Sequence, residues 1–225
     1  MPRAIIVGAS TGIGLALAHR LVATGWTVTG LARGPAGLAH PAYRHVVADV
    51  RASSYREILA GADVPDVCVY AAGIGHDLDL ATPVHEADVF LTNLVGLAVT
   101  AEVLLPRMVA ARAGHLIGIS SQADQLRSPE APSYAASKAG MSSYLEGLAL
   151  ACRRHGVAVT NVRFGFVDTA MAKSKVKPFM ITADRAARTV ERCIARRPIR
   201  KTVPLRMAGL LWLYRWGARL RIWAS

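Results

Sequence analysis

A phenol and an ammonium group stand four residues apart near the middle of the chain, in Tyr134-Ala135-Ala136-Ser137-Lys138. Residues at this spacing lie on one face of an α-helix. A free phenol titrates near ~10, and a positive charge beside it favours the ionised form. The pair can therefore donate a proton to a reacting oxygen atom, or accept one from it.

Two further polar side chains precede this pair. Ser121 ends the apolar run Ile117-Gly118-Ile119-Ser120-Ser121, thirteen residues before Tyr134, and Asn93 falls inside a long apolar helical pattern twenty-eight residues before Ser121. A serine hydroxyl can hydrogen-bond a substrate oxygen and stabilise developing charge. Each residue alone has an ordinary structural explanation, as a strand-end hydroxyl, a helix-bend amide, a core phenol or a solvated charge. The four together indicate catalysis.

A glycine-rich turn follows the first apolar run. Ala4-Ile5-Ile6-Val7 leads into Gly8-Ala9-Ser10-Thr11-Gly12-Ile13-Gly14 and then into a helical pattern. Glycines let the backbone turn tightly and approach a ligand, and the N–H groups of a helix N-terminus attract phosphate. This position, at the first strand-to-helix crossover, predicts a dinucleotide-binding turn. Its spacing differs from G-x-G-x-x-G, and a turn that binds no ligand is the alternative.

The end of the second expected strand bears on the choice of nicotinamide cofactor. About 20 residues past the turn, NAD enzymes carry Asp or Glu for the ribose 2′-hydroxyl, whereas here Ala32 occupies that place and Arg33 follows. An arginine without a carboxylate beside it suits a 2′-phosphate. We therefore expect NADP(H) in preference to NAD(H), with an ordinary surface arginine as the alternative.

Short β-branched runs alternate with helical stretches, which is typical of a parallel sheet covered by helices. Strands are expected near 4–7, 27–31, 45–47, 67–70, 115–119 and 157–163, and helices near 12–24, 54–60, 85–112, 133–154 and 182–194. The predicted fold class is α/β: a doubly wound Rossmann fold, a single domain with helices on both faces of the sheet. Residues 1–200 are expected to form it, and 201–225 a basic, Trp-rich C-terminal segment, within the same domain or peripheral to it.

The net charge of +12 on 225 residues lies entirely near the C-terminus. Residues 1–170 hold 13 Lys and Arg against 13 Asp and Glu, whereas 171–225 hold 14 against 2. Lys173, Lys175 and Lys177 can steer an anionic substrate or carrier, or belong to a solvated loop. Segment 205–223 mixes Leu, Trp and Arg as interfacial helices do. We expect it to pack on the protein or on a second subunit, with peripheral membrane contact as the alternative and no nucleic-acid partner, because no recognition motif accompanies the charge.

Cysteine and histidine usage limits the remaining function classes. Cys68, Cys152 and Cys193 are odd in number and far apart, which favours a reducing compartment over a disulfide framework. The first residues lead straight into a strand without the pattern of a signal peptide, so a cytoplasmic location is expected. The seven histidines show no metal-ligand spacing, so no metal site is predicted.

The glycine turn and the four polar residues resemble the short-chain dehydrogenase/reductase family over residues 4 to about 195. The resemblance implies an NADP(H)-dependent oxidoreductase that transfers a hydride between the nicotinamide and a carbonyl or secondary alcohol. The implied catalytic residues are Asn93, Ser121, Tyr134 and Lys138, with Tyr134 as general acid/base and Asn93 holding a water that relays protons from Lys138. The implied cofactor-binding residues are Gly8, Ser10, Thr11, Gly12, Ile13, Gly14, Arg33, Asp49, Val50, Ala72, Gly73, Tyr134, Lys138, Gly165, Val167 and Thr169.

The chain departs from the family pattern at three places: Tyr70-Ala71-Ala72-Gly73 for Asn-Asn-Ala-Gly, Phe164-Gly165 for Pro-Gly, and Gln122-Ala123-Asp124 where a glycine commonly follows the serine. These departures bear on local geometry and substrate shape rather than on the reaction type. We expect a small apolar or carrier-bound substrate and a homo-dimer or tetramer. The alternative is a catalytically silent dinucleotide-binding sensor or interaction protein that acts through its basic C-terminus.

Overall fold

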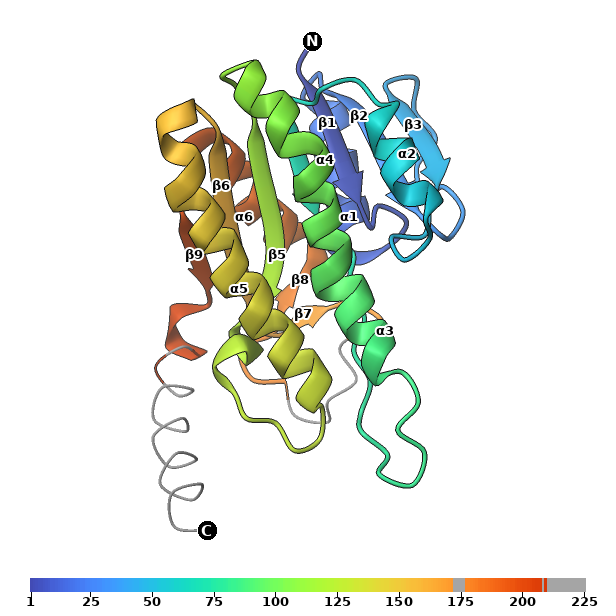
Figure 1. Cartoon of the computed structure of the whole chain (residues 1–225), viewed down its shortest axis with the longest axis vertical. Coiled ribbons are helices and arrows are strands. Elements are labelled where there is room, and N and C mark those ends of the chain that lie inside the picture. The colour runs from blue at the N-terminus through green and yellow to red at the C-terminus, as the bar shows by residue number, and fades with distance from the viewer. Residues whose placement is uncertain (172–176, 208, 210–225) are drawn as a thin grey trace.

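The computed structural model describes residues 1–171, 177–207 and 209. Seven parallel strands form the central sheet in the order β3-β2-β1-β4-β5-β6-β9 (Figure 1). The strands are β1 (Arg3–Val7), β2 (Thr27–Ala32), β3 (Tyr43–Val47), β4 (Val67–Tyr70), β5 (His115–Ser121), β6 (Ala158–Phe164) and β9 (Arg200–Val203). The strand order reverses between β1 and β4, and ligands bind at such switch points, outside the carboxyl ends of the strands.

Helices cover both faces of the sheet. The long ones are α1 (Gly12–Ala23), α2 (Ser54–Ala60), α4 (Gly96–Ala110), α5 (Pro132–Cys152) and α6 (Ala183–Arg196). One apolar core lies beneath α1 and α6, and a second beneath α2, α4 and α5; Figure 1 shows α4 and α5 in front of the sheet and α6 behind it. The predicted doubly wound Rossmann fold is confirmed.

The strand sequences explain the two cores. In β1, Ala4 and Ile6 face one core while Ile5 and Val7 face the other, because successive side chains of a strand point to opposite faces. All four residues of β4 are buried, as the continuous apolar run Val67–Tyr70 predicts for a central parallel strand.

The helix expected over 85–112 is interrupted in the structure. It consists of α3 (Glu86–Phe90), a π-helical turn η1 (Leu91–Val95) and α4. Asn93 lies in the middle of the π turn. π-helical turns are rare in proteins, but those that do occur are often found at functional sites.

Three short strands were not predicted. β9 is the polar tetrapeptide Arg200-Lys201-Thr202-Val203, and β7 (Val167–Asp168) pairs with β8 (Ile181–Thr182) in a separate small sheet. β9 spans the boundary expected at residue 200, so the central sheet continues to Val203. The Trp-rich segment 205–223 lies outside the described residues apart from 205–207 and 209, as do Lys173 and Lys175; the basic C-terminal segment remains a prediction.

Within the described part of the chain, one helical run is long and apolar enough to cross a membrane by length and composition alone. It spans Glu86–Ala110, with a mean hydropathy of 1.8 in its most apolar window, and half of that window is buried. Leu97, Leu104 and Met108 lie fully buried in the core beneath α4. We therefore interpret this run as a core helix.

Some of the C-terminal positive charge lines a groove of about 680 Å³ between α6 and β9. Its basic residues are Arg185, Arg188, Arg192, Arg196, Arg200 and Lys201. Two of them are paired, Arg188 with Asp184 and Arg200 with Glu146. Residues 1–170, which carry no net charge, thus supply the first six strands of the central sheet. The basic residues 171–225 supply α6, which covers one face of this sheet, and its last strand, β9.

Gly14→Ala is expected to destabilise the fold, because a Cβ there would overlap the backbone oxygen of Gly8. Overpacking of this kind costs about 1–3 kcal/mol. The matched control is Gly147→Ala on the exposed face of α5, where nothing lies within 4 Å of the added Cβ. Alanine is preferred to glycine inside a helix by about 0.5–1 kcal/mol, so this control should raise the free energy of unfolding. Urea denaturation measures both; a Gly14→Ala variant as stable as the wild type would contradict the packing described.

Candidate active site

The glycine turn lies at the carboxyl end of β1, beside the end of β4. Gly8 has a φ of +88°, and its N–H donates to the oxygen of Leu31 at 2.7 Å. A Cβ at Gly8 would lie 2.6 Å from the backbone nitrogen of Ala72. Both the conformation and the space require glycine here, and the turn is thereby pressed against the residue that follows β4.

The N-terminus of α1 opens from this turn. Thr11 is the N-cap, its side chain makes no capping hydrogen bond, and the first turn of the helix holds no acidic residue. The leading N–H groups of a helix have no partner within it, and they favour anions. A Cβ at Gly12 would lie 3.2 Å from Cγ2 of Thr169, so the segment after β6 closes on the same place. The turn fits the phosphates of a dinucleotide; Ile13 packs against the core beneath α1.

The residues expected around the adenosine lie after β2 and β3. Arg33 is exposed, and a Cβ on the next residue, Gly34, would lie 3.6 Å from Oγ of Ser10. Asp49 accepts hydrogen bonds from Arg51, at 3.0 Å from its backbone N–H and 2.9 Å from its Nη2. Those bonds, with a smaller contribution from the charge of Arg33, lower the pKa of Asp49. The structure therefore brings Arg33 and Ser10 to neighbouring loops, whereas the Asp49 carboxylate is engaged with Arg51.

Tyr134 and Lys138 lie in α5, next to the end of β5. Lys138 is only 4% exposed; its Nζ donates to the oxygen of Ile119 at 3.0 Å and lies 5.8 Å from the ring centroid of Tyr134. Burial lowers the pKa of Lys138 to about 8. Burial also raises the pKa of Tyr134, while a hydrogen bond with Ser121 acts in the opposite direction. The phenol, the ammonium and the serine hydroxyl thus share one partly buried site.

Asn93 connects the loop after β4 to α5. Its Nδ2 donates to the oxygen of Ile74 and to Oγ of Ser137, both at 2.9 Å, and its Oδ1 accepts the N–H of Ile74 at 2.8 Å. Ser137 in turn donates to the backbone oxygen of Tyr134 at 2.8 Å. These partners are all protein groups, so the expected water-holding role of Asn93 remains a prediction.

The loop after β4 runs along three of the four predicted catalytic residues. A Cβ at Gly73 would lie 3.3 Å from Oδ1 of Asn93 and 3.5 Å from Nζ of Lys138, and one at Gly75 would lie 3.0 Å from the ring of Tyr134. Gly75 and Ser137 were not among the predicted site residues. Their signals were the second glycine of Gly73-Ile74-Gly75 and a serine placed three residues after the tyrosine.

Tyr70 occupies a position where the family pattern has asparagine. Its hydroxyl donates to the backbone oxygen of Thr92 in the π turn at 2.5 Å, and any side chain at Gly96 would collide with that hydroxyl. The phenol therefore ties β4 to the turn that carries Asn93. In this chain, a tyrosine hydroxyl at the departing position joins the sheet to that helix.

The remaining predicted residues follow β6 or flank β3. Gly165 donates its N–H to the oxygen of Val203 at 2.9 Å, Val167 is buried in β7, and Oγ1 of Thr169 lies 3.4 Å from the oxygen of Val167. Val50 packs against α4 at Gly96. The segment 165–169 leads from the end of β6 to the glycine turn. It therefore brings the predicted residues that follow β6 next to those of the turn. Among the described residues, no three His, Cys, Asp or Glu side chains are placed to hold a metal ion.

Comparisons with known proteins identify the family of the chain. A family model described as short chain dehydrogenase matches residues 2–178. An uncharacterized oxidoreductase of Myxococcus xanthus is 31% identical, over 92% of this chain and 92% of its own length. The 3-oxoacyl-[acyl-carrier-protein] reductase FabG of Vibrio harveyi is 30% identical, over 76% of this chain and 75% of its own.

A solved structure supports the fold independently. The short-chain dehydrogenase from Sphingobium yanoikuyae, in complex with NADPH, matches with a TM-score of 0.83 over 100% of this chain and 96% of that chain, at 21% identity. The family model spans residues 2–178, a range that holds the glycine turn, the π turn and the helix α5 of Tyr134 and Lys138. The chain therefore belongs to the short-chain dehydrogenase/reductase family, whose members are oxidoreductases that bind a nicotinamide dinucleotide.

Proposed function

We propose that the protein transfers a hydride between NADP(H) and a carbonyl or secondary alcohol, with Tyr134 as the general acid in reduction and the base in oxidation. The observation that carries this proposal is the convergence of Tyr134, Lys138 and Ser121 beside the loop after β4, which also packs against the glycine turn. A dinucleotide-binding sensor without chemistry would have no use for this arrangement, and we do not favour it.

The chain offers groups for each part of the cofactor. We assign the pyrophosphate to the turn Gly8–Gly14 and the N-terminus of α1, because the backbone is closely packed at Gly8 and Gly14 and the first turn of α1 holds no acidic residue. Ser10 and Arg33 would hold the 2′-phosphate, Asp49 and Val50 would border the adenine, and Val167 and Thr169 would contact the carboxamide. Bound NADPH supplies the hydride to the carbonyl carbon. The NADPH complex of the Sphingobium relative supports this choice.

Tyr134 and its neighbours account for the proton. Reduction leaves negative charge on the former carbonyl oxygen, and the phenol of Tyr134, whose raised pKa keeps it protonated, would neutralise that charge. Ser121 would hydrogen-bond the same oxygen. The ammonium of Lys138 stabilises the phenolate that remains; lowering a phenol's pKa by about 3 units requires roughly 4 kcal/mol of such stabilisation. A bound oxidised nicotinamide, which is also positive, would add to this stabilisation.

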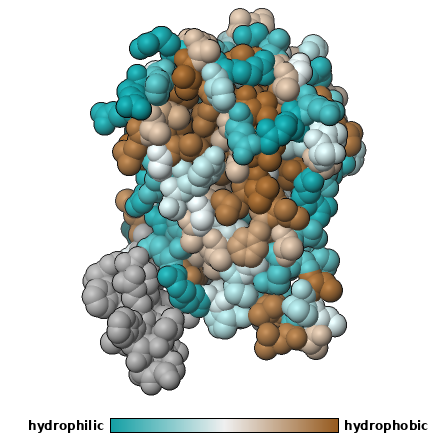
Figure 2. All heavy atoms as spheres, in the orientation of Figure 1, coloured by the Kyte–Doolittle hydropathy of each residue, from teal (hydrophilic) through white to brown (hydrophobic). Residues whose placement is uncertain are grey.

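The substrate class we propose is a ketone on an apolar or carrier-bound acyl chain. The Vibrio harveyi relative, named for reducing 3-oxoacyl groups on acyl carrier protein, supports it. We also propose a homo-dimer or tetramer. Figure 2 shows apolar surface over α4 and α5, and the exposed apolar side chains of the described residues include Leu91 and Val95 of η1 and Leu150 of α5. A cytoplasmic location fits the three buried free thiols; membrane contact through 205–223 stays a prediction.

Tyr134→Phe should abolish carbonyl reduction while leaving the cofactor site intact. Loss of general acid catalysis costs about 10²–10⁴-fold, so kcat with NADPH and a panel of β-keto esters and cyclic ketones should fall by at least about a hundredfold. NADPH binding, followed by fluorescence, should be unchanged. Tyr144→Phe, which removes another phenol of α5, is the control and should retain activity. Wild-type turnover by Tyr134→Phe would disprove the assignment, and a wild type inactive on every ketone would favour the sensor.

The rate of reduction should depend on the protonation of Lys138. Its positive form assists Tyr134, and its pKa is lowered to about 8, so kcat/KM for reduction should be constant below that pH and decline as pH rises through it. Alcohol oxidation needs the ionised phenol and should instead accelerate with pH. Initial rates in both directions across a constant-ionic-strength buffer series provide the measurement. A reduction rate that keeps increasing above the pKa of Lys138 would be inconsistent with this role.

Arg33→Ala should weaken NADPH selectively. A charged hydrogen bond contributes about 1.5–3 kcal/mol, which corresponds to a rise of roughly tenfold or more in KM for NADPH, and KM for NADH should not rise. Arg44→Ala, which removes an exposed arginine of β3, is the matched control for surface charge. Equal effects of Arg33→Ala on both cofactors would show that Arg33 does not meet the 2′-phosphate.

A further inference from the structure

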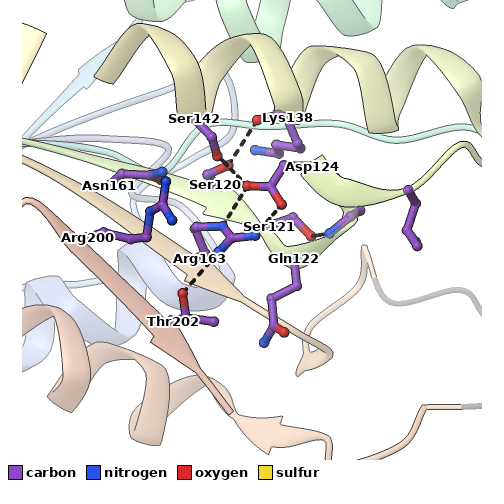
Figure 3. A network of polar contacts seen from close by, with 12 residues as sticks. Ser120, Ser121, Gln122, Asp124, Lys138, Ser142, Asn161, Arg163, Arg200 and Thr202 are labelled. Carbon is purple, nitrogen blue, oxygen red and sulfur yellow. Dashed lines mark hydrogen bonds and ion pairs between the residues drawn. The ribbon is translucent and has the colours of Figure 1, made fainter. Parts of the chain in front are cut away.

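A buried ion pair lies directly behind Ser121 (Figure 3). The side chains of Asp124 and Arg163 are 6% and 9% exposed. Nε and Nη2 of Arg163 donate to the two carboxylate oxygens of Asp124, at 2.6 and 2.5 Å. A two-bond contact of this kind fixes the orientation of both groups as well as their separation.

The pair joins the turn after Ser121 to three other elements. Asp124 belongs to the 3₁₀ turn η2 (Gln122–Gln125), which Ser121 itself caps by accepting the N–H of Ala123 at 3.1 Å. Arg163 belongs to β6, and its Nη1 donates to Thr202 of β9 at 3.2 Å. Ser142 of α5 donates to Asp124 at 2.7 Å. The carboxylate thus holds η2 to β6 and α5 at once, and through Arg163 to β9.

A second connection reaches α5 from the other side of Ser121. The hydroxyls of Ser120 and Ser142 lie 2.8 Å apart, and Ser120 Oγ lies 3.2 Å from the backbone oxygen of Lys138. Ser120 is the donor toward the backbone oxygen of Lys138, and either hydroxyl can be the donor between Ser120 and Ser142. Ser120 before Ser121 and Asp124 after it therefore both contact Ser142 of α5, the helix that also carries Tyr134 and Lys138.

Stability alone does not explain a buried pair at this position. Apolar residues of similar volume often stabilise a core as well as a buried ion pair does, whereas the ion pair enforces one arrangement of its elements. Asp124 also falls within Gln122-Ala123-Asp124, and Arg163 immediately precedes Phe164-Gly165. Both segments depart in sequence from the family pattern, so the ion pair lies where this chain differs from that pattern.

We propose that Asp124 and Arg163 are positioning residues for the reaction proposed above: their ion pair holds the turn after Ser121 against α5, so that the hydroxyls of Ser121 and Tyr134 meet the same substrate oxygen. The inference rests on the proposed role of Tyr134. Neither side chain of the pair touches the reacting atoms; both act through the placement of Ser121.

Asp124→Asn tests the proposal, because it keeps the shape of the side chain and removes the charge. The matched control is Glu146→Gln. Glu146 of α5 accepts hydrogen bonds from Asn161 of β6 at 2.8 Å and from Arg200 of β9 at 2.7 Å, so it joins the same helix and strands without contacting η2. Since small misplacements of catalytic groups are costly, kcat for ketone reduction should fall about tenfold or more in Asp124→Asn, with KM for NADPH unchanged, and by less than about twofold in Glu146→Gln. Equal losses of kcat would overturn the proposal.

The pKa of Tyr134 gives a readout that needs no turnover. It can be followed by NMR with ring-labelled tyrosine, the signal being assigned by its loss in Tyr134→Phe. Removing the charge of Asp124 would by itself lower this pKa, and loss of the Ser121 hydrogen bond would raise it. Lys138, the ammonium group beside the ring, is the same in both variants. A rise in Asp124→Asn but not in Glu146→Gln supports the proposal, and a fall or no change overturns it. This holds even if no ketone is reduced, which would count against the proposed function alone.

Asp124→Glu decides the question if Asp124→Asn does not fold. It preserves the charge that Arg163 requires and displaces η2 by one methylene, and Glu146→Asp is its charge-preserving control. A rise in the pKa of Tyr134 and a loss of kcat confined to Asp124→Glu support positioning. The same behaviour in both variants overturns it.

Discussion

The site depends on one steric constraint at the carboxyl end of β1. Neither Gly8 nor Gly14 has room for a β-carbon, the first because of Ala72 and the second because of Gly8 itself. This close packing sets the separation of β1, β4 and α1. It directs the N-terminus of α1 toward the place for a phosphate, and it fixes where the loop after β4 begins. Since that loop continues past Asn93, Lys138 and Tyr134, one segment connects the glycine turn to the proposed catalytic residues.

Burial sets the electrostatics of the proposed catalytic pair. Desolvation lowers the pKa of Lys138 to about 8 and raises that of Tyr134, so in the structure described the buried environment by itself favours the neutral form of both groups. At a pKa of about 8 the amine of Lys138 is still mostly protonated at neutral pH, so its positive charge is available to stabilise the phenolate form proposed for Tyr134.

Much of this could be predicted from the sequence, and the failures have physical causes. The glycine turn, the apolar central strands and Tyr134-x-x-x-Lys138 are local patterns, and the structure places them as expected. The π turn was missed because an apolar helical pattern tolerates one extra residue without losing its apolar character. β9 was missed because it is short and polar at the edge of the sheet. The Asp124–Arg163 pair could not be found at all, because its partners are 39 residues apart and only the fold brings them together.

The number of residues in the π turn sets the rotation of α3 relative to α4. A wider turn holds one residue more than an α-helical turn, and each residue of an α-helix rotates the chain by about 100°. Deleting Leu94 or Val95 would restore a regular helix, and it would rotate everything before the deletion relative to α4. Glu86 of α3 would then turn away from Ser133, whose hydroxyl it accepts at 3.0 Å, and Asn93 from Ile74. Such a deletion would separate α3 from the start of α5.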